Sequence, residues 1–535
     1  MTPPGSTPPP RGQRQFDAAS DAGPWRVALA ITALATVVRL VALRASPLQL
    51  YPDEAQYWLW SRHLAFGYFS KPPMVAWLIG LTTLAGDAEA MVRASSPLLH
   101  ALAALCLFQV GRRLYDARTG LAACALYLLM PGVALSSFVV STDTGLIVFL
   151  SMAIWAYAAL QDGGGARRRL AIAAGFGLAL GLAFLSKYAA AYLLIGLAAH
   201  LTLSPAARRA WTPASAATAA AVCAAVLAPN VIWNALHGFA TVSHTAANAN
   251  WSAGHLFNPM NLLTFLGGQF GVLGPIPFAV LIGGAVWLGW KRRLTGADLL
   301  LLCFAAPPLL IVSVQAFVSR ANANWAAAAF APGVVLAAAW LLRWRARRWL
   351  TAALALQAVV AAVVVLFLVA PSLADRVGVA NSYKRVRGWR ELTTALVERA
   401  RAEDATSSLS AVAVDDRFFF NEAAYYGRDY FAAGPPLRIW VKGASAENQA
   451  ELEAPLTSSD GKRVLAASID SRNVAAMAAD FASAKGHEIT TTRLDARHKR
   501  SVEMFLGEGF QPVPRAGPQP AHTALSDRSR PQPMR

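Results

Sequence analysis

Cysteine is scarce in this chain, with four in 535 residues. All four, Cys106, Cys124, Cys223 and Cys303, lie inside apolar runs, and none forms a Cys-x-x-Cys pair. This pattern excludes a disulfide framework and a cysteine-based zinc site. The segment after Pro371 has no cysteine, so an oxidising compartment would leave its chemistry unchanged.

Charged residues are also few, at 15% of the chain, whereas 56% of the residues are hydrophobic. This composition excludes an ordinary soluble protein. Apolar runs long enough to cross a bilayer recur from about Trp25 to Pro371. No cleavable signal peptide is evident. The first apolar run contains Arg39 and lacks a small-residue cleavage site, which is typical of a retained signal anchor.

Acidic residues are outnumbered by basic ones, 30 to 48, which gives a formal net charge of +18. The basic residues form short clusters between the apolar runs, at 112–118, 167–169, 208–209, 291–293 and 343–348. This is the positive-inside pattern of cytoplasmic loops. No basic aromatic face or recognition motif accompanies the charge, so we expect no nucleic-acid partner.

These clusters predict a polytopic α-helical membrane protein with about eleven transmembrane helices, a cytoplasmic N-terminus and an outer C-terminal domain. The predicted spans are 26–46, 94–111, 119–138, 144–160, 170–186, 188–204, 214–233, 272–290, 298–318, 326–342 and 350–370. The apolar stretch 74–86 is too short to span, and we interpret it as a re-entrant or interfacial helix. No internal repeat is visible.

Composition divides the chain into four parts. We predict a disordered cytoplasmic tail at 1–24, a transmembrane domain at 25–371, a small extracytoplasmic α/β domain at 372–510 and a disordered tail at 511–535. The first outer loop, 47–93, belongs to the transmembrane domain. In the α/β domain we expect helices at 389–402 and 421–426 and strands at 409–414 and 437–441, and the segments 463–469, 474–484 and 501–506 continue the alternation.

An acidic-aromatic stretch, Tyr51 to Trp58, follows the first apolar run and contains Asp53 and Glu54. Acids beside a membrane are costly unless they face water, a partner or a substrate, so both are candidate functional residues. The predicted topology puts a further acid, Asp143, on the same outer face. The other candidates on that face are Lys71, Lys187, Arg320, Asn234, His237, Asn324, Trp325 and Tyr57. Cations, a carboxylate and aromatics suit an anionic, sugar-bearing lipid.

Each candidate has a simpler structural interpretation. Asp53 and Asp143 could cap helices, and Glu54 could be a solvated residue of a first helical turn. Lys71 and Lys187 could extend to lipid headgroups, and Arg320 could bind a lipid phosphate. The aromatic residues Tyr57, Trp58, Trp60 and Trp77 could be interfacial anchors. His237, His244 and His255 share one outer loop, but their spacing matches no zinc signature.

Several motifs follow one another between Val27 and Trp340: YPDEAQYWLWSRHLAFGYFSKPPMVAWLIGL, VRASSPLLHALAALCLFQVGRRLY, STDTGL, LAFLSKY, PNVIWNALHGF and SRANANWAAAAF. Their order resembles the GT-C membrane glycosyltransferases of family 39. This group includes protein O-mannosyltransferases, the aminoarabinose transferase of lipid A and relatives grouped with rhizobial galacturonic-acid transferases.

The resemblance implies a polyprenyl-phosphate-linked sugar donor on the outer face, with Asp53 as general base and Asp143 as second acid. Lys71 and Arg320, with Lys187, would hold the donor phosphate. The aminoarabinose transferase has Glu-Lys-Pro where this chain has Ser70-Lys71-Pro72. The acid that helps hold a metal there is missing, so a divalent metal cofactor stays an open question.

We therefore expect a glycosyltransferase of the bacterial inner membrane, in contact with membrane lipids. It would move a sugar to a hydroxyl of an envelope glycolipid, glycan or protein. The main alternative is a transporter or flippase of lipid-linked sugars. Transporter sites lie near the bilayer midplane, often between repeated halves, whereas here the polar residues gather at one face. A third possibility is an inactive scaffold, against which the intact Asp53 and Asp143 argue.

Overall fold

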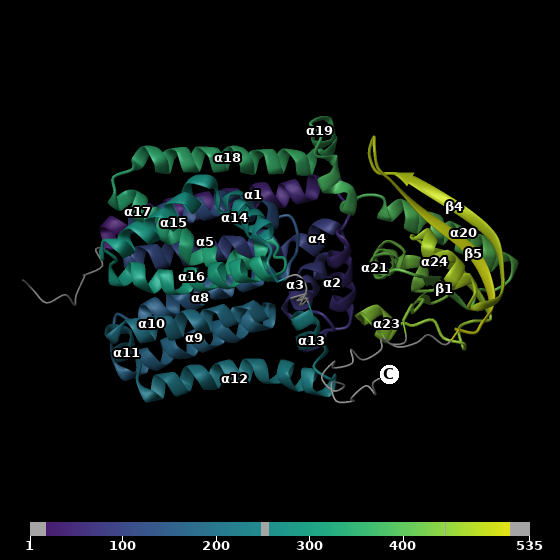
Figure 1. Ribbon diagram of the computed structural model, residues 1–535, viewed down its shortest axis with the longest axis horizontal. Helices are drawn as coiled ribbons and strands as arrows, with labels where there is room; N and C mark the ends of the chain where they lie inside the picture. Colours follow the sequence, from purple (N-terminus) through teal and green to yellow (C-terminus); the bar gives the residue numbers. More distant parts are fainter. Residues whose placement is uncertain (1–17, 248–255, 444–445, 514–535) are drawn as a thin grey trace, which may run out of the picture. The chain divides into compact units, whose positions relative to one another are not determined.

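The computed structural model describes residues 18–247, 256–443 and 446–513. The chain divides into two compact units. Figure 1 colours the chain by residue number, from purple at the N-terminus to yellow at the C-terminus. The helical unit comprises residues 1–48 and 60–378, and the α/β unit comprises residues 49–59 and 379–535. Most of the tails predicted at 1–24 and 511–535 lies outside the described residues, as does His255.

The helical unit is built from long, roughly parallel helices (Figure 1). Its helices are α1 (Ala18–Ala45), α3 (Met74–Thr82), α4 (Glu89–Arg93), α5 (Ser95–Leu114), α6 (Ala117–Leu129), α7 (Pro131–Ser136), α8 (Thr142–Leu160), α9 (Ala166–Ser186), α10 (Ala191–Leu203), α11 (Pro205–Ala210), α12 (Pro213–Leu236), α13 (Ala240–Ala247), α14 (Pro259–Leu273), α15 (Pro275–Trp290), α16 (Gly296–Val318), α17 (Phe330–Arg343), α18 (Arg347–Val369) and α19 (Pro371–Arg376). Short 3-10 turns are η1 (Thr83–Ala85), η2 (Tyr188–Ala190) and η3 (Ala323–Ala329). Helices α8, α9 and α12 pack in sequence, and α5 packs on α6 and α8.

Within the described residues, eight helices are long and apolar enough to cross a bilayer, or nine spans if the bent pair α14–α15 counts as one. This confirms a polytopic α-helical membrane protein. The eight correspond to the predicted spans that begin at 26, 94, 144, 170, 214, 298, 326 and 350. The stretch 74–86 forms α3 and η1, an apolar helix too short to span, as predicted.

Three predicted spans differ from the structure. The span at 119–138 is broken into α6 and α7, because Pro131 has no N–H to continue the hydrogen-bonded ladder. The span at 188–204 is the short pair η2 and α10. The span at 272–290 is the second half of the pair α14–α15, which bends by 117°. The break falls at Gly274 and Pro275, where a regular helix ends.

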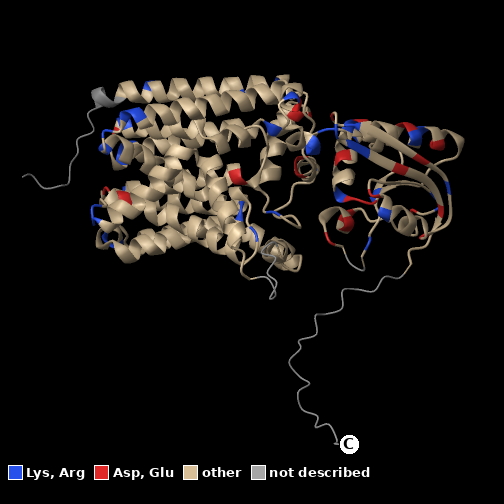
Figure 2. Cartoon of the chain, turned by 45° about the horizontal axis from the view of Figure 1, so that its top comes forward, with Lys and Arg blue, Asp and Glu red and all other residues tan. Residues whose placement is uncertain are grey.

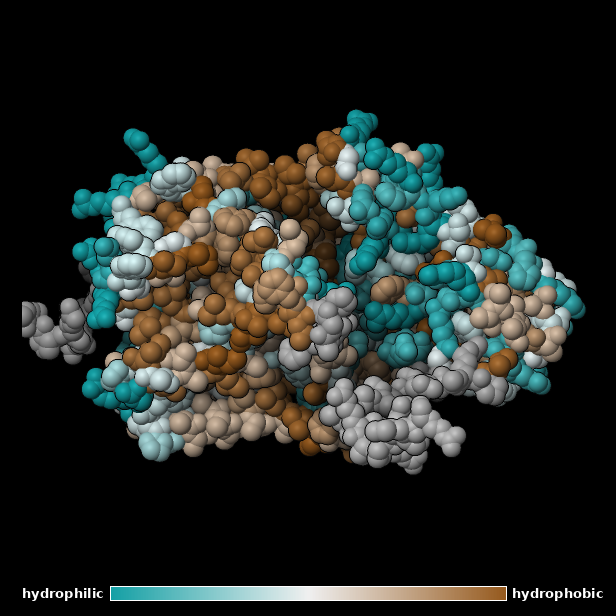
Figure 3. Space-filling model, in the orientation of Figure 1, coloured by the Kyte–Doolittle hydropathy of each residue, from teal (hydrophilic) through white to brown (hydrophobic). Residues whose placement is uncertain are grey.

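On the surface of the helical unit, basic residues and hydrophobic residues lie in different places. Lys and Arg gather at one end of the helices, the end at which α11 lies (Figure 2). The flank that faces the viewer in Figure 3 is mostly hydrophobic. An apolar flank with a basic end is typical of a membrane protein. The side of the membrane on which that end lies stays a prediction.

The α/β unit contains a five-stranded sheet of order β2-β1-β3-β5-β4. Its strands are β1 (Ala411–Val414), β2 (Leu437–Ile439), β3 (Arg463–Ser468), β4 (Phe481–Arg493) and β5 (Lys499–Phe510), and its helices are α20 (Trp389–Thr406), α21 (Arg417–Tyr426), α22 (Arg428–Phe431), α23 (Gln449–Glu453) and α24 (Ser471–Ala478), preceded by the turn η4 (Ala380–Val386). Strand β1 pairs in parallel with β2 and β3, and β5 runs antiparallel to β3 and β4.

Helices cover both faces of this sheet. Val412 and Val414 of β1 pack with Leu392 and Leu396 of α20 on one face, whereas the alternate β1 residues pack with Met477 of α24 on the other. Asp415 directly follows β1 and is buried, and burial raises the pKa of its carboxyl group.

The structure matches the expected helix 389–402 and the strands 409–414 and 437–441. The expected segment 501–506 lies within β5, whereas most of strand β4 falls outside the expected segments. Strand β4 is an edge strand with many exposed residues, so its sequence lacks the apolar alternation of a half-buried strand. Residues 49–59 group with the α/β unit, although the sequence assigns the whole loop 47–93 to the transmembrane domain.

Candidate active site

Three predicted site residues meet in the helical unit, around Asp143. Its Oδ1 accepts a hydrogen bond from Lys187 Nζ at 2.6 Å, and its Oδ2 accepts one from Asn324 Nδ2 at 2.9 Å. These residues come from the start of α8, the end of α9 and the turn η3. The Asp143 side chain is 13% exposed and that of Lys187 is 26% exposed. We call this group the Asp143 cluster.

The cluster rules out two simpler interpretations. The N-cap residue of α8 is Ser141, and Asp143 is the second residue of the helix, so Asp143 is not its cap. Lys187 pairs with Asp143, so its ammonium group does not merely extend to a lipid headgroup. One of its three N–H donors is given to Asp143, and no partner of the other two is found within the described residues.

Close packing of α8 on α9 holds the Asp143 cluster together. A Cβ atom on Gly145 would lie 2.7 Å from Ser186 Oγ and 3.1 Å from Ser186 Cβ. Ser186 precedes Lys187 and donates from Oγ to the carbonyl of Leu182 at 2.9 Å. Gly145 therefore allows α8 to approach α9 close to the Asp143 carboxylate.

Replacing Gly145 with Ala should disturb this contact. Displacing Ser186 should cost about 1–3 kcal/mol, the usual range for overpacking, and it should lower the midpoint of thermal unfolding in detergent. The matched control is Gly175→Ala in α9, because a Cβ there meets nothing within 4 Å. Equal unfolding midpoints for the two variants would contradict the role of Gly145.

A second polar group lies next to Lys187. Tyr188 Oη donates to Asn230 Oδ1 at 3.1 Å and accepts from Asn234 Nδ2 at 3.1 Å. Asn230 Nδ2 donates in turn to the carbonyl of Phe66 at 2.6 Å. Asn234 is 2% exposed, and its Oδ1 has no hydrogen-bond partner within the described residues. Asn234 thus connects the end of α12 to the η2 turn that follows Lys187.

The remaining candidates of the helical unit are Lys71, Arg320, Trp325 and His237. Lys71 ends a turn in which Tyr68 N–H donates to the Lys71 carbonyl at 3.1 Å, and Thr241 of α13 donates to the Tyr68 carbonyl at 2.6 Å. Arg320 is exposed just after α16. Trp325 is half-buried in η3 and packs against the main apolar core.

His237 ends α12, and its ring stacks on Trp233 with centroids 4.1 Å apart. Its Nδ1 also lies 2.7 Å from the Trp233 carbonyl oxygen. These contacts with Trp233, in the last turn of α12, account for the position of the His237 imidazole. A role for His237 in substrate binding stays a prediction.

The first candidate acid belongs to the α/β unit. Helix α2 (Pro52–Arg62) begins at Pro52, so Asp53 is its second residue and does not occupy the N-cap position. Asp53 is half-buried, and no hydrogen bond or ion pair of its carboxylate is found within the described ranges.

Glu54 differs from its neighbour Asp53. It is completely buried rather than solvated, and its Oε2 accepts from the backbone N–H of Tyr51 at 2.9 Å. This contact satisfies an N–H group at the start of α2, as in one half of a capping box. Tyr57, one turn later, is also buried.

Sequence reasoning did not select Gly145, Tyr188 or Asn230. The signals were present, because each lies within a motif that contains a selected residue: Gly145 in STDTGL, Tyr188 in LAFLSKY and Asn230 in PNVIWNALHGF. A tyrosine or an asparagine in an apolar run needs a hydrogen-bond partner, which makes such residues informative.

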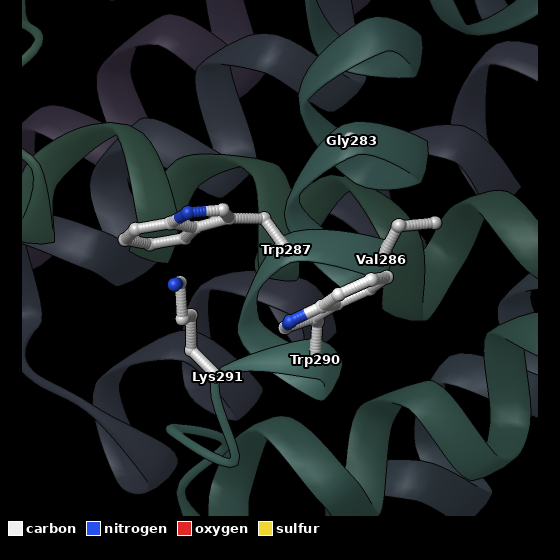
Figure 4. A pocket seen from close by; sticks show the side chains of 5 residues that line it. All are labelled: Gly283, Val286, Trp287, Trp290 and Lys291. Carbon is white, nitrogen blue, oxygen red and sulfur yellow. The ribbon is translucent and has the colours of Figure 1, made fainter.

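No group of three or more His, Cys, Asp or Glu residues that could hold a metal ion occurs among the described residues. A surface hollow lies on α15, and no candidate residue lines it (Figure 4). Its lining residues are Gly283, Val286, Trp287, Trp290 and Lys291. Exposed tryptophans beside a lysine are typical of a membrane interface.

Residues 70–233 match the family described as dolichyl-phosphate-mannose-protein mannosyltransferase. The chain is 40% identical over 309 residues to the lipid A galacturonosyltransferase RgtD of Rhizobium johnstonii, a match that covers 57% of this chain and 63% of that protein. It is 27% identical over 318 residues to the undecaprenyl phosphate-alpha-4-amino-4-deoxy-L-arabinose arabinosyl transferase of Pectobacterium atrosepticum, covering 54% of each. The chain thus spans less than two thirds of either relative.

The fold is similar to that of ArnT from Cupriavidus metallidurans in the apo state, with a TM-score of 0.62 at 18% identity over 91% of this chain and 98% of that one. The same protein bound to undecaprenyl phosphate gives a TM-score of 0.62 at 17% identity, covering 90% and 98% of the two chains. The chain therefore has a GT-C fold. Within the helical unit, Lys187 is paired with Asp143, and the half-buried Asp53 belongs to the α/β unit.

Proposed function

We propose that this protein transfers a sugar from a polyprenyl-phosphate donor to a hydroxyl group of an envelope glycolipid such as lipid A. The observation that carries the proposal is the Asp143 cluster, in which a lysine donates to an acid that also accepts from an amide. The relatives named above act on lipid A or on an undecaprenyl-phosphate sugar. An envelope glycan or a protein remains the other acceptor class to test.

The proposed roles follow the chemistry of the side chains. Lys71, Lys187 and Arg320 neutralise the donor phosphate. Asp143 fixes the direction of Lys187, and Asn324 holds the Asp143 carboxylate. Asp53 takes the proton from the acceptor hydroxyl, whose oxygen then attacks the anomeric carbon. The bond from that carbon to the phosphate oxygen breaks, and polyprenyl phosphate leaves with the electron pair.

The remaining candidates receive supporting roles. Asn234 holds Tyr188 beside Lys187, and Glu54 stabilises the start of the helix that carries Asp53. His237, Trp325 and Tyr57 are proposed contacts for the sugar or the lipid, because aromatic faces bind apolar sugar faces and chains.

The direct test uses the purified protein with a radiolabelled polyprenyl-phosphate sugar and lipid A in detergent. Galacturonic acid is the first sugar to test, because one relative is a galacturonosyltransferase. Label should move into the lipid A fraction, and mass spectrometry should show the added sugar. Absence of transfer with every donor and acceptor class would refute the proposal.

The alternative, a flippase of lipid-linked sugars, predicts a different result in the same system. In proteoliposomes, labelled donor would move between leaflets without the appearance of a glycosylated acceptor. The polar candidates of the helical unit gather at helix ends, whereas a transporter site is expected near the midplane. This favours the transferase.

The topology prediction has its own test. We propose that the basic end of the helical unit is cytoplasmic and that the α/β unit is periplasmic. Reporter fusions after Arg113, Arg169 and Arg293 should therefore report the cytoplasm, and a fusion after Asp375 should report the periplasm. A cytoplasmic signal after Asp375 would contradict the proposed side of the site.

A further inference from the structure

The segment 49–59, which carries Asp53, is a built-in part of the α/β unit. It lies more than 300 residues before the rest of that unit in the chain, yet the two group together by contact. The segment is bound by Gln49, Leu50, Tyr51 and Trp58, each through a different contact. The proposal below rests on the proposed function of Asp53.

Gln49 makes the central connection, because it caps helix α20 from outside that helix. Gly388 is the N-cap residue of α20, with a φ of 82° and no side chain that could accept from the first N–H groups. Gln49 Oε1 supplies the acceptor instead, at 2.7 Å from Trp389 N and 3.2 Å from Arg390 N. Most helices take this contact from their own N-cap residue.

Gln49 uses its other polar groups on the same part of the α/β unit. Its Nε2 donates to Glu391 Oε2 at 2.7 Å, and its backbone N–H donates to the Val386 carbonyl at 3.1 Å. The residue is only 7% exposed. Because the amide oxygen, the amide nitrogen and the backbone N–H of this buried glutamine all have partners, Gln49 is held in place and restrains the chain that follows it.

Contacts on either side of Asp53 complete the attachment. Before it, Leu50 N–H donates to Tyr426 Oη at 2.9 Å, and Arg385 Nη1 donates to Tyr51 Oη at 2.5 Å. After it, the ring of Trp58 meets Tyr425 edge to face at 4.9 Å. Leu59 packs against the apolar core of the α/β unit. Asp53 is therefore held between two anchored stretches.

We propose that Gln49 is a positioning residue for Asp53, and that the α/β unit serves as the frame which sets the place of the general base. A general base must lie within hydrogen-bond reach of the proton that it removes, and a misplacement of about 1 Å can cost about a hundredfold in rate. Loosening the frame should lower kcat, because Asp53 acts in the chemical step. It should leave the donor KM nearly unchanged, because the proposed phosphate ligands lie elsewhere in the chain.

The test exchanges the two partners of one hydrogen bond. Gln49→Ala removes the cap, and Gln49→Glu keeps an acceptor for α20 but faces Glu391 with a second carboxylate. Both should lower kcat by roughly ten- to a hundredfold. The double variant Gln49→Glu/Glu391→Gln restores the hydrogen bond with its direction reversed, and it should recover most of kcat. Gln449→Ala, which removes a glutamine of α23 in the same unit, is the matched control.

A second readout does not depend on activity. Hydrogen–deuterium exchange of residues 50–59 should rise about tenfold in Gln49→Ala, Gln49→Glu and Tyr426→Phe, and it should return to the wild-type rate in the double variant. Unchanged exchange in the single variants, or a double variant as impaired as Gln49→Glu, would overturn the inference. If the wild-type protein transfers no sugar, the proposed function fails while the exchange measurement still decides whether the frame exists.

Discussion

Replacing Asp53 with Asn is expected to reduce the proposed sugar transfer by at least about a hundredfold, the lower end of the effect of a general base. Asn has nearly the same size but cannot take a proton. Asp53 is the second residue of α2 and is half-buried, so the substitution should leave the fold intact. The loss should appear in kcat, with donor binding near the wild-type value.

Two companion variants define what the Asp53 result means. Asp162→Asn removes a carboxylate that pairs with Arg113 at the basic end of the helical unit, and it should keep the wild-type rate. Glu54→Gln should be milder than Asp53→Asn, because the Gln oxygen can still accept from Tyr51 N–H. Purified Asp53→Asn protein that transfers sugar at close to the wild-type rate would exclude Asp53 as the base.

The helices of this protein could be predicted from the sequence because hydropathy and positive clusters are local signals. Long apolar runs in the sequence correspond to long helices in the structure, for example α8 and α9. The breaks within these helices are harder to predict, because the sequence stays apolar across Met130–Pro131 and across Gly274–Pro275, where the helices end. Hydropathy measures the cost of burial in lipid and not the continuity of the hydrogen-bonded ladder.

The partners of the candidate residues could not be predicted in the same way. Asp143, Lys187 and Asn324 were each selected as outer-face polar residues, but nothing local shows that one carboxylate binds both other side chains. The attachment of residues 49–59 to the α/β unit is a stronger example. In the sequence, Gln49 is an ordinary polar residue. Its role as a cap of α20 depends on Gly388, the N-cap residue of that helix, which lies 339 positions later. Such long-range pairings follow from the fold alone.

Replacing Lys187 with Met is expected to reduce transfer by roughly ten- to a hundredfold and also to destabilise the helical unit. The substitution removes the partner of Asp143, a carboxylate that is only 13% exposed. Leaving a fully buried charge without its partner costs about 3–5 kcal/mol, and partial exposure of this pair should reduce the cost to about 1–3 kcal/mol. The midpoint of thermal unfolding in detergent and the rate of transfer should both fall.

The double variant Asp143→Asn/Lys187→Met separates the structural and chemical roles of the pair. The introduced asparagine would carry no charge and could still contact Asn324, so the double variant should be more stable than Lys187→Met, with a coupling of about 1–2 kcal/mol. Transfer should stay low, because the cation proposed for the donor phosphate is absent. Recovery of both stability and transfer would instead show that the pair only packs α8 on α9. Arg113→Met, at the opposite end of the helical unit, removes one of the two arginine partners of Asp162 and should change neither the rate nor the donor KM.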